Sequence, residues 1–132
     1  MLDSSGTLRV RAYTAGGALP VAEALVRISG AEEENRDVSY TLLTDNDGQT
    51  TIVNLPAPSA KFSLLPNPSE APSATYDIEI TREGYLKKKV LGVPIFSGVN
   101  SVQLLNMIPD SGNHTTEIPR GNQYFIIPDN NL

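Results

Sequence analysis

Alternation of apolar and polar residues predicts short β-strands along most of this chain. Over residues 6–13, every second side chain is apolar, which is the period-two pattern of a strand with one buried face. The same alternation returns over residues 23–29 and 76–81. The inward side chains of these three segments are expected to supply the core: Leu8, Val10, Ala12, Ala24, Val26, Ile28, Tyr76, Ile78 and Ile80.

Four further segments have strand-like composition, and turn signals separate them. They cover residues 40–44, 50–55, 86–91 and 99–108. Ten glycines and ten prolines punctuate the 132 residues, which disfavours long helices. Lysines in the segment over 86–91 indicate an edge strand, because charge there discourages unwanted strand pairing.

A proline-rich stretch interrupts the strands after residue 55. Because proline has no N–H to donate to a ladder, this stretch is predicted to be a long loop rather than a central strand. Its prolines are Pro56, Pro58, Pro66, Pro68 and Pro72.

Seven short strands without helical periodicity predict an all-β fold. We expect a seven-stranded antiparallel Greek-key β-sandwich of the prealbumin-like or Ig-like type over residues 1–109. Residues 110–132 are predicted to be an extended C-terminal tail with an apolar docking segment, which docks on a sheet edge or on a neighbouring chain and makes a homo-oligomer one expectation. The partner-binding residues expected in this tail are Ile118, Tyr124, Phe125, Ile126 and Ile127.

Charge and composition narrow the classes of partner. The chain carries a net charge of −5 and has no cysteine, so disulfides and thiolate metal sites are excluded. Its basic residues are scattered apart from Lys87, Lys88 and Lys89, which argues against nucleic-acid binding. No window is apolar enough for membrane insertion. The N-terminus lacks the pattern of a signal peptide, so the compartment stays unassigned, with cytoplasmic synthesis and association with a spore, cell envelope or particle as the expectation.

Several motifs together resemble a known family of β-sandwich domains. The segments Gly6-Thr7-Leu8-Arg9-Val10, Leu19-Pro20-Val21-Ala22-Glu23-Ala24-Leu25-Val26 and Thr44-Asp45-Asn46-Asp47-Gly48 look like those of carboxypeptidase regulatory-like, or prealbumin-like (transthyretin-like), domains. Leu55-Pro56-Ala57-Pro58, Ala74-Thr75-Tyr76 and Ile118-Pro119 most resemble the sandwich modules of clostridial spore-cortex-lytic and other peptidoglycan-associated proteins. The resemblance covers about residues 6–108 and implies a bacterial module that accompanies a catalytic or wall-binding domain.

The sequence contains few of the residue patterns that are typical of catalytic sites. The single histidine, His114, lies in a polar segment, and no Gly-x-Ser-x-Gly nucleophile elbow occurs. Glu32, Glu33 and Glu34 form a charge run that is typical of a hydrated loop. We therefore expect no enzyme activity and no cofactor.

The turn and the strands hold candidate residues for a metal site and for a covalent crosslink. Asp45 and Asp47, followed by Gly48, are weak metal candidates, because the distal carboxylate of a calcium loop is missing; a hairpin turn is favoured. A lysine–asparagine isopeptide crosslink has candidates in Asn106 and Glu79. The strand over 6–13 offers only Arg9 and Arg11 in place of the lysine, so no crosslink is expected.

The leading functional expectation is a noncatalytic accessory or structural module that contacts a protein or a cell-wall glycan. Lys87 and Lys89 are candidate partner-binding residues beside those of the tail, although protection of a sheet edge is the simpler interpretation. The alternative is a structural subunit of a phage or tail-like particle that assembles through its tail and sheet edges. A cell-wall lytic enzyme is the third alternative.

Overall fold

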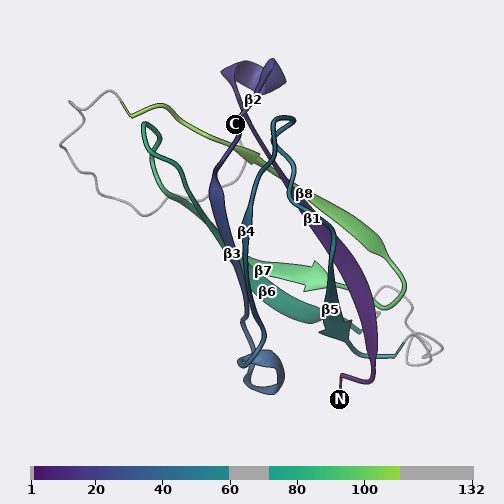
Figure 1. The fold of residues 1–132 in the computed structure, drawn as a ribbon. Helices are drawn as coiled ribbons and strands as arrows, with labels where there is room; N and C mark the ends of the chain where they lie inside the picture. The colour runs from purple at the N-terminus through teal and green to yellow at the C-terminus, as the bar shows by residue number, and fades with distance from the viewer. Residues whose placement is uncertain (1, 60–71, 111–132) are drawn as a thin grey trace.

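The fold is an all-β sandwich, seen in a computed structural model that describes residues 2–59 and 72–110 (Figure 1). Over these residues the chain forms eight strands and two short 3-10 turns, with no α-helix. Sheet A contains β1 (Ser4–Thr14), β2 (Leu19–Pro20), β5 (Val53–Ala57) and β8 (Asn100–Asn106). Sheet B contains β3 (Leu25–Gly30), β4 (Ser39–Leu43), β6 (Ala74–Thr81) and β7 (Lys88–Ile95). The two turns are η1 (Ala15–Gly17) and η2 (Glu33–Asn35).

Strand β1 is the centre of sheet A. Strand β8 lies along one side of it, from the pair Thr7–Asn100 to the pair Tyr13–Asn106. The opposite side is shared, since β5 pairs with the first half of β1 and β2 pairs with its last two residues. Figure 1 shows β1 and β8 running together, with η1 at the top of the view and η2 at the bottom. The two turns therefore lie at opposite ends of the sandwich.

Sheet B is antiparallel throughout, in the order β4-β3-β6-β7. Within residues 2–59 and 72–110, strand β7 pairs only with β6, which confirms for this part of the chain the prediction that the lysine-rich segment is an edge strand. The strand itself begins at Lys88 and continues to Ile95, beyond the predicted end at residue 91.

The core between the sheets consists of the predicted alternating residues and their counterparts on other strands. All nine predicted inward side chains are at most 1% exposed, because a strand with period-two alternation places all its apolar side chains on one face. Strands β5, β6, β7 and β8, with the segments that adjoin the strands, add the remaining core residues: Val21, Val53, Leu55, Ala57, Ala74, Val93, Ile95, Leu105 and Met107.

Two details of the predicted topology were wrong. The structure has eight strands rather than seven, because Leu19 and Pro20, predicted as loop, return along β1 after the turn η1 and pair with Thr14 and Tyr13. The sandwich is also not purely antiparallel, because β1 and β8 run parallel. Periodicity within one strand carries no information on the direction of its neighbour, so neither feature was accessible from the alternation.

Pro56 corrects the interpretation of the proline-rich segment, since it lies inside β5 and pairs with Ser5 of β1. The N–H of Val10 and of Ala12 point toward the β5 side of β1, where they bond to Thr50 Oγ1 and Gly48 O. By alternation, Ser5 points its backbone groups to the other side, so Pro56 occupies a position without ladder hydrogen bonds. A proline there costs no backbone bond. Residues 60–71, with Pro66 and Pro68, lie outside the described residues.

The chain between β8 and the end of the described part is tied to sheet B. The N–H of Leu86 donates to Ile108 O, and the N–H of Asp110 donates to Gly84 O, each at 2.9 Å. The predicted division into a domain over 1–109 and a tail over 110–132 stays a prediction, because residues 111–132 lie outside the described part of the chain.

Candidate binding surface

The outer face of sheet A places cationic, aromatic and apolar side chains next to one another. Arg9, Arg11 and Tyr13 alternate with the buried residues of β1 and therefore point outward. The parallel register sets Val102 beside Arg9 and Leu104 beside Arg11. Val102 is 59% exposed and Leu104 is 50% exposed. Two large apolar side chains thus stand in solvent next to two guanidinium groups.

A shallow hollow of about 250 Å³ lies on this face, lined by Arg11, Tyr13, Gly16, Gly17 and Leu104. Gly16 and Gly17 have φ angles of 67° and 94°, a left-handed conformation that glycine adopts readily. No heavy atom lies within 4 Å of where a Cβ would stand on either glycine. The left-handed turn therefore borders the hollow without filling it.

The two arginines of this face differ in how their donors are used. Arg9 donates from Nε to Thr50 O at 3.1 Å, which fixes the guanidinium over the end of the neighbouring turn. Among the residues that the structure describes, none makes a hydrogen bond or ion pair with the side chain of Arg11. Its five donor hydrogens and its charge are therefore available to a ligand, and a carboxylate is the group that a guanidinium binds most directionally.

The free edge of β8 is the second feature of this surface. The N–H of Thr7 donates to Val99 O at 3.0 Å, and the N–H of Met107 donates to Tyr13 O at 2.7 Å. In a parallel ladder, alternate residues turn their N–H and C=O to the same neighbour, so residues 101, 103 and 105 face β1. Val102 and Leu104 therefore direct their backbone groups away from β1, to a side where no described strand pairs.

The other sheet edges carry protection that β8 lacks. Strand β7 has Lys88 and Lys89, β5 is interrupted by Pro56, and the side chain of Tyr40 reaches from β4 to Asn54 O at 3.2 Å. Strand β8 reads Asn-Ser-Val-Gln-Leu-Leu-Asn, with no charge and no proline. Edges of this kind are templates for pairing with another strand.

Asp45 and Asp47 lie in the predicted turn, but this turn joins β4 of sheet B to β5 of sheet A and does not close a hairpin. Asp45 Oδ1 accepts hydrogen bonds from the N–H of Asp47 at 2.8 Å and of Gln49 at 3.0 Å, and Gly48 has a φ of 77°. The hydrogen bond from the Gln49 backbone, then that from Asp47, lowers the pKa of the Asp45 carboxyl, with a smaller contribution from the charge of Arg9. In the described part of the chain, no three His, Cys, Asp or Glu side chains cluster as metal ligands would.

Lys87 and Lys89 lie on the outer face of sheet B, apart from the face that carries Arg11. Lys87 Nζ is 2.9 Å from Glu79 Oε2; the hydrogen bond from Lys87 is the main cause that lowers the pKa of Glu79. Lys89 pairs in register with Glu79 and borders a small hollow of about 130 Å³ with Arg27 and Asp77. Charges of both signs alternate here, so this face has no single-sign patch.

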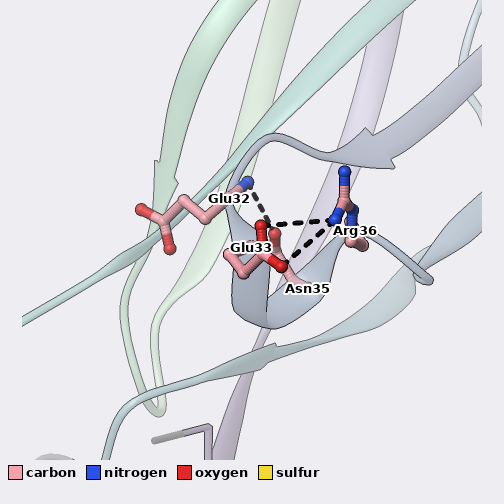
Figure 2. Close-up of polar contacts among 4 residues, drawn as sticks. All are labelled: Glu32, Glu33, Asn35 and Arg36. Atoms are coloured by element: carbon pink, nitrogen blue, oxygen red, sulfur yellow. Dashed lines mark hydrogen bonds and ion pairs between the residues drawn. The ribbon is translucent and has the colours of Figure 1, made fainter.

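The acidic run belongs to η2, where its residues hold the loop together (Figure 2). Asn35, only 1% exposed, accepts from the N–H of Glu32 at 2.8 Å and donates to Thr75 O at 2.9 Å. Glu33 pairs with Arg36 at 3.1 Å on the surface. The charge run was predicted as a hydrated loop, and the buried Asn35 that anchors it was missed.

The remaining candidates are scattered or outside the described residues. Glu79 points to the outer face of sheet B, whereas Asn106 lies in sheet A, so the two do not form the pair that a crosslink needs. His114 and the predicted tail residues Ile118, Tyr124, Phe125, Ile126 and Ile127 lie outside the described part of the chain. In that described part, no helix has the length and apolarity to cross a membrane.

The exposed edge of β8 was missed by the sequence reasoning. The sequence did contain a signal for the exposed face of this strand, because the apolar residues 102 and 104 share that face with the polar Asn106. Alternation alone left open which face of this strand is buried, and the structure shows that Leu105 and Met107 supply the core instead.

Comparison with known proteins supports the fold and assigns no family. No protein-family model and no curated protein matches the chain. Among solved structures, the Bacillus anthracis TIE protein aligns over 80% of this chain at 16% identity with a TM-score of 0.53, covering 17% of that protein. A putative carbohydrate binding protein from Bacteroides uniformis aligns over 79% of this chain at 13% identity with a TM-score of 0.51, covering 41% of its own length.

Catechol 1,2-dioxygenase from Acinetobacter radioresistens aligns as well, over 89% of this chain and 56% of the enzyme, at 11% identity and a TM-score of 0.57. The chain thus spans less than two thirds of each of these proteins. At such identities the matches show a shared β-sandwich-like fold and nothing about chemistry.

Proposed function

We propose that this chain is a noncatalytic accessory module that uses the outer face of sheet A to bind a cell-wall glycan or a protein in a bacterial envelope or spore cortex. The observation that carries the proposal is the unpaired guanidinium of Arg11 beside Tyr13 and Leu104 around an open hollow. A carboxylate on the ligand would pair with Arg11, and the flat apolar surface of a sugar or peptide would pack on Tyr13 and Leu104.

Two further facts support a binding role. The motifs at residues 55–58, 74–76 and 118–119 resemble those of peptidoglycan-associated sandwich modules, and one solved structure with a similar fold is named a putative carbohydrate binding protein. Peptidoglycan carries both sugar rings and free carboxylates, so it matches the mixed character of this face.

The test is sedimentation with purified peptidoglycan. The full-length chain is expected to co-sediment, and the double variant Arg11→Ser, Leu104→Ser is expected to lose most of this binding. The matched control is Arg27→Ser, Leu91→Ser, which removes the same residue types from sheet B. Equal binding by the two variants, or no binding by the parent, contradicts the proposal.

The alternative function, a structural subunit of a phage or tail-like particle, is favoured by the charge-free edge of β8. Such a subunit would pair that edge with a neighbour. Concentration-dependent growth in size, measured by sedimentation velocity without added ligand, separates this alternative from a monomeric binding module. Release of wall fragments in a lysis assay would instead support the third alternative, a lytic enzyme.

A further inference from the structure

We infer that the free edge of β8 is occupied by the chain's own residues 121–127, which add to sheet A as a strand antiparallel to β8. The inference starts from unsatisfied backbone groups. The N–H and C=O of Val102 and Leu104 point away from β1, and their side chains stand in solvent. An added strand satisfies these four groups and packs beside the apolar side chains on the side away from β1.

Hydrogen bonds at Asn106 and at Asn100 show how much of the β8 backbone edge is open. At one end, Lys88 Nζ already donates to Asn106 O at 2.8 Å. At the other end, Thr7 Oγ1 donates to the side chain of Asn100 at 2.7 Å, which leaves the backbone of Asn100 open. The open stretch therefore covers residues 100–104, and a strand of five to seven residues fills it.

Residues 121–127 have the composition that this edge requires. They read Gly-Asn-Gln-Tyr-Phe-Ile-Ile, with no charge and no proline, like β8 itself. Aromatic and β-branched residues favour strands, and two of the four large apolar side chains would lie beside Val102 and Leu104. Pro119 and Pro128 bracket the segment, and proline biases the residue before it toward extended backbone.

The connection is long enough. The last described residue, Asp110, lies four residues after the end of β8 and is held at the turn between β6 and β7 by its bond to Gly84 O. The ten residues 111–120 span at most about 33 Å, whereas β8 itself is about 20 Å long. A segment that enters beside Asn106 and runs back toward Asn100 is antiparallel to β8 and uses the shortest path.

Attachment in the same chain favours this occupant over a second molecule. A short tether gives the attached segment an effective concentration of the order of millimolar, above the concentration at which most proteins work. The inference does not depend on the proposed glycan, because it rests on the backbone edge of β8. The two sites share the side chain of Leu104, which the hollow borders on the β1 side and the added strand contacts on the opposite side.

The experiment is residue-resolved amide hydrogen exchange by NMR on the full-length chain. The N–H of Val102 and Leu104 are expected to exchange at least about ten-fold more slowly than in the variant Phe125→Asp, Ile126→Asp, because exchange reports local opening. The amides of Gln103 and Leu105, which bond to β1, serve as internal references that stay slow in both proteins. The matched control, Asn113→Asp, Asn130→Asp, adds the same charge outside residues 121–127 and should behave like the parent.

Three outcomes overturn the inference. Fast exchange of Val102 and Leu104 in the parent shows an open edge. Protection that persists in the Phe125→Asp, Ile126→Asp variant shows a different occupant. Protection that rises with protein concentration shows that a second copy supplies the strand. Binding to peptidoglycan, measured on the same proteins, reports separately on the proposed function.

Discussion

The hydroxyl of Tyr76 in sheet B donates a hydrogen bond to the carbonyl oxygen of Pro56 in sheet A, with 2.6 Å between the two oxygen atoms. The ring is fully buried, and the carbonyl it reaches belongs to the position of β5 that makes no ladder bonds. One side chain therefore links the two sheets and provides a hydrogen-bond donor for the Pro56 carbonyl, which has no partner in the strand pairing.

Replacing Tyr76 by Phe is expected to lower the free energy of unfolding by about 1–2 kcal/mol, because Pro56 O loses its donor in a partly buried place. Denaturant unfolding measures the change. Tyr40→Phe is the matched control, since the Tyr40 hydroxyl also bonds a backbone carbonyl, but at an exposed site. Equal losses in the two variants would contradict a special role for the buried bond.

The same residue predicts a pH dependence. Burial raises the pKa of the Tyr76 phenol above its usual value of 10.0, an effect reinforced by the charge of Glu32 and partly opposed by a hydrogen bond with Asn35. With the folded-state pKa above the unfolded one, the stabilisation is fully present below about pH 10 and is lost as the pH rises through the folded pKa. The stability difference between the parent and Tyr76→Phe should shrink over that range, as measured by urea unfolding at successive pH values.

Asp45→Ala should destabilise the turn over residues 45–49 at neutral pH, because two backbone N–H groups lose their acceptor. The folded-state pKa of Asp45 is lowered below 3.8, so its stabilisation is present above that value and is lost as the pH falls through the folded pKa. Thermal melting should show the deficit at pH 7 and its disappearance in acid. Asp47→Ala is the control and should melt like the parent.

Calcium is expected to leave the melting temperature of the parent unchanged, because the Asp45 oxygen is already used by the turn. A ligand that binds only the native state raises the melting temperature by mass action. A clear rise with added calcium, reversed by a chelator, would mean that Asp45 and Asp47 hold a metal after all.

Gly30→Ala should destabilise the fold by about 1–3 kcal/mol, the usual cost of forcing extra volume into a packed place. A Cβ at Gly30 would collide with the backbone of Asn35, the residue that anchors η2. Ser29→Ala, one position earlier on β3, is the control with a small expected effect. If the two variants unfold at the same denaturant concentration, the prediction is wrong, and the η2 loop moves to accommodate the added Cβ without loss of stability.

Removing the lysines from the β7 edge tests their protective role. The variant Lys87→Thr, Lys89→Thr keeps only Lys88 on this edge and is expected to associate at high concentration, because an edge with less charge pairs more readily with other edges. Its unfolding free energy should fall by no more than about 1 kcal/mol, since the Lys87–Glu79 pair is largely exposed. Light scattering during concentration measures the association. Lys61→Thr, Arg120→Thr removes the same number of charges elsewhere and controls for net charge.

Patterns local to one segment could be predicted from the sequence, and relations between segments could not. The alternation at Leu8, Val10 and Ala12 predicted both strand and buried face, because each side chain reports on its own position. The parallel pairing of β1 with β8 depends on two segments more than ninety residues apart, and nothing in either sequence encodes that direction. Pro56 was predicted to exclude a strand, and this was wrong. The sequence does not show whether the missing N–H of a proline faces a neighbouring strand or points away from it.

The same limit applies to the candidate surface. The turn at Asp45 was predicted because its acceptor and its glycine lie in four consecutive residues. The grouping of Arg11, Tyr13 and Leu104 requires the register between β1 and β8, which only the fold supplies. Asn35 was hidden in a charged run, because its burial follows from the approach of Thr75 in β6.

The pairing of β1 with β8 has a consequence for the nascent chain. Thr14 Oγ1 bonds Met107 O across 93 positions of sequence, so the central strand of sheet A lacks one whole neighbour until the last strand has been made. At about 5–20 residues per second, the ribosome needs roughly 5–20 s to supply it. During that interval the apolar face of β1 is available to chaperones or to another nascent chain, and such long-range closure belongs to the slow class of folding reactions.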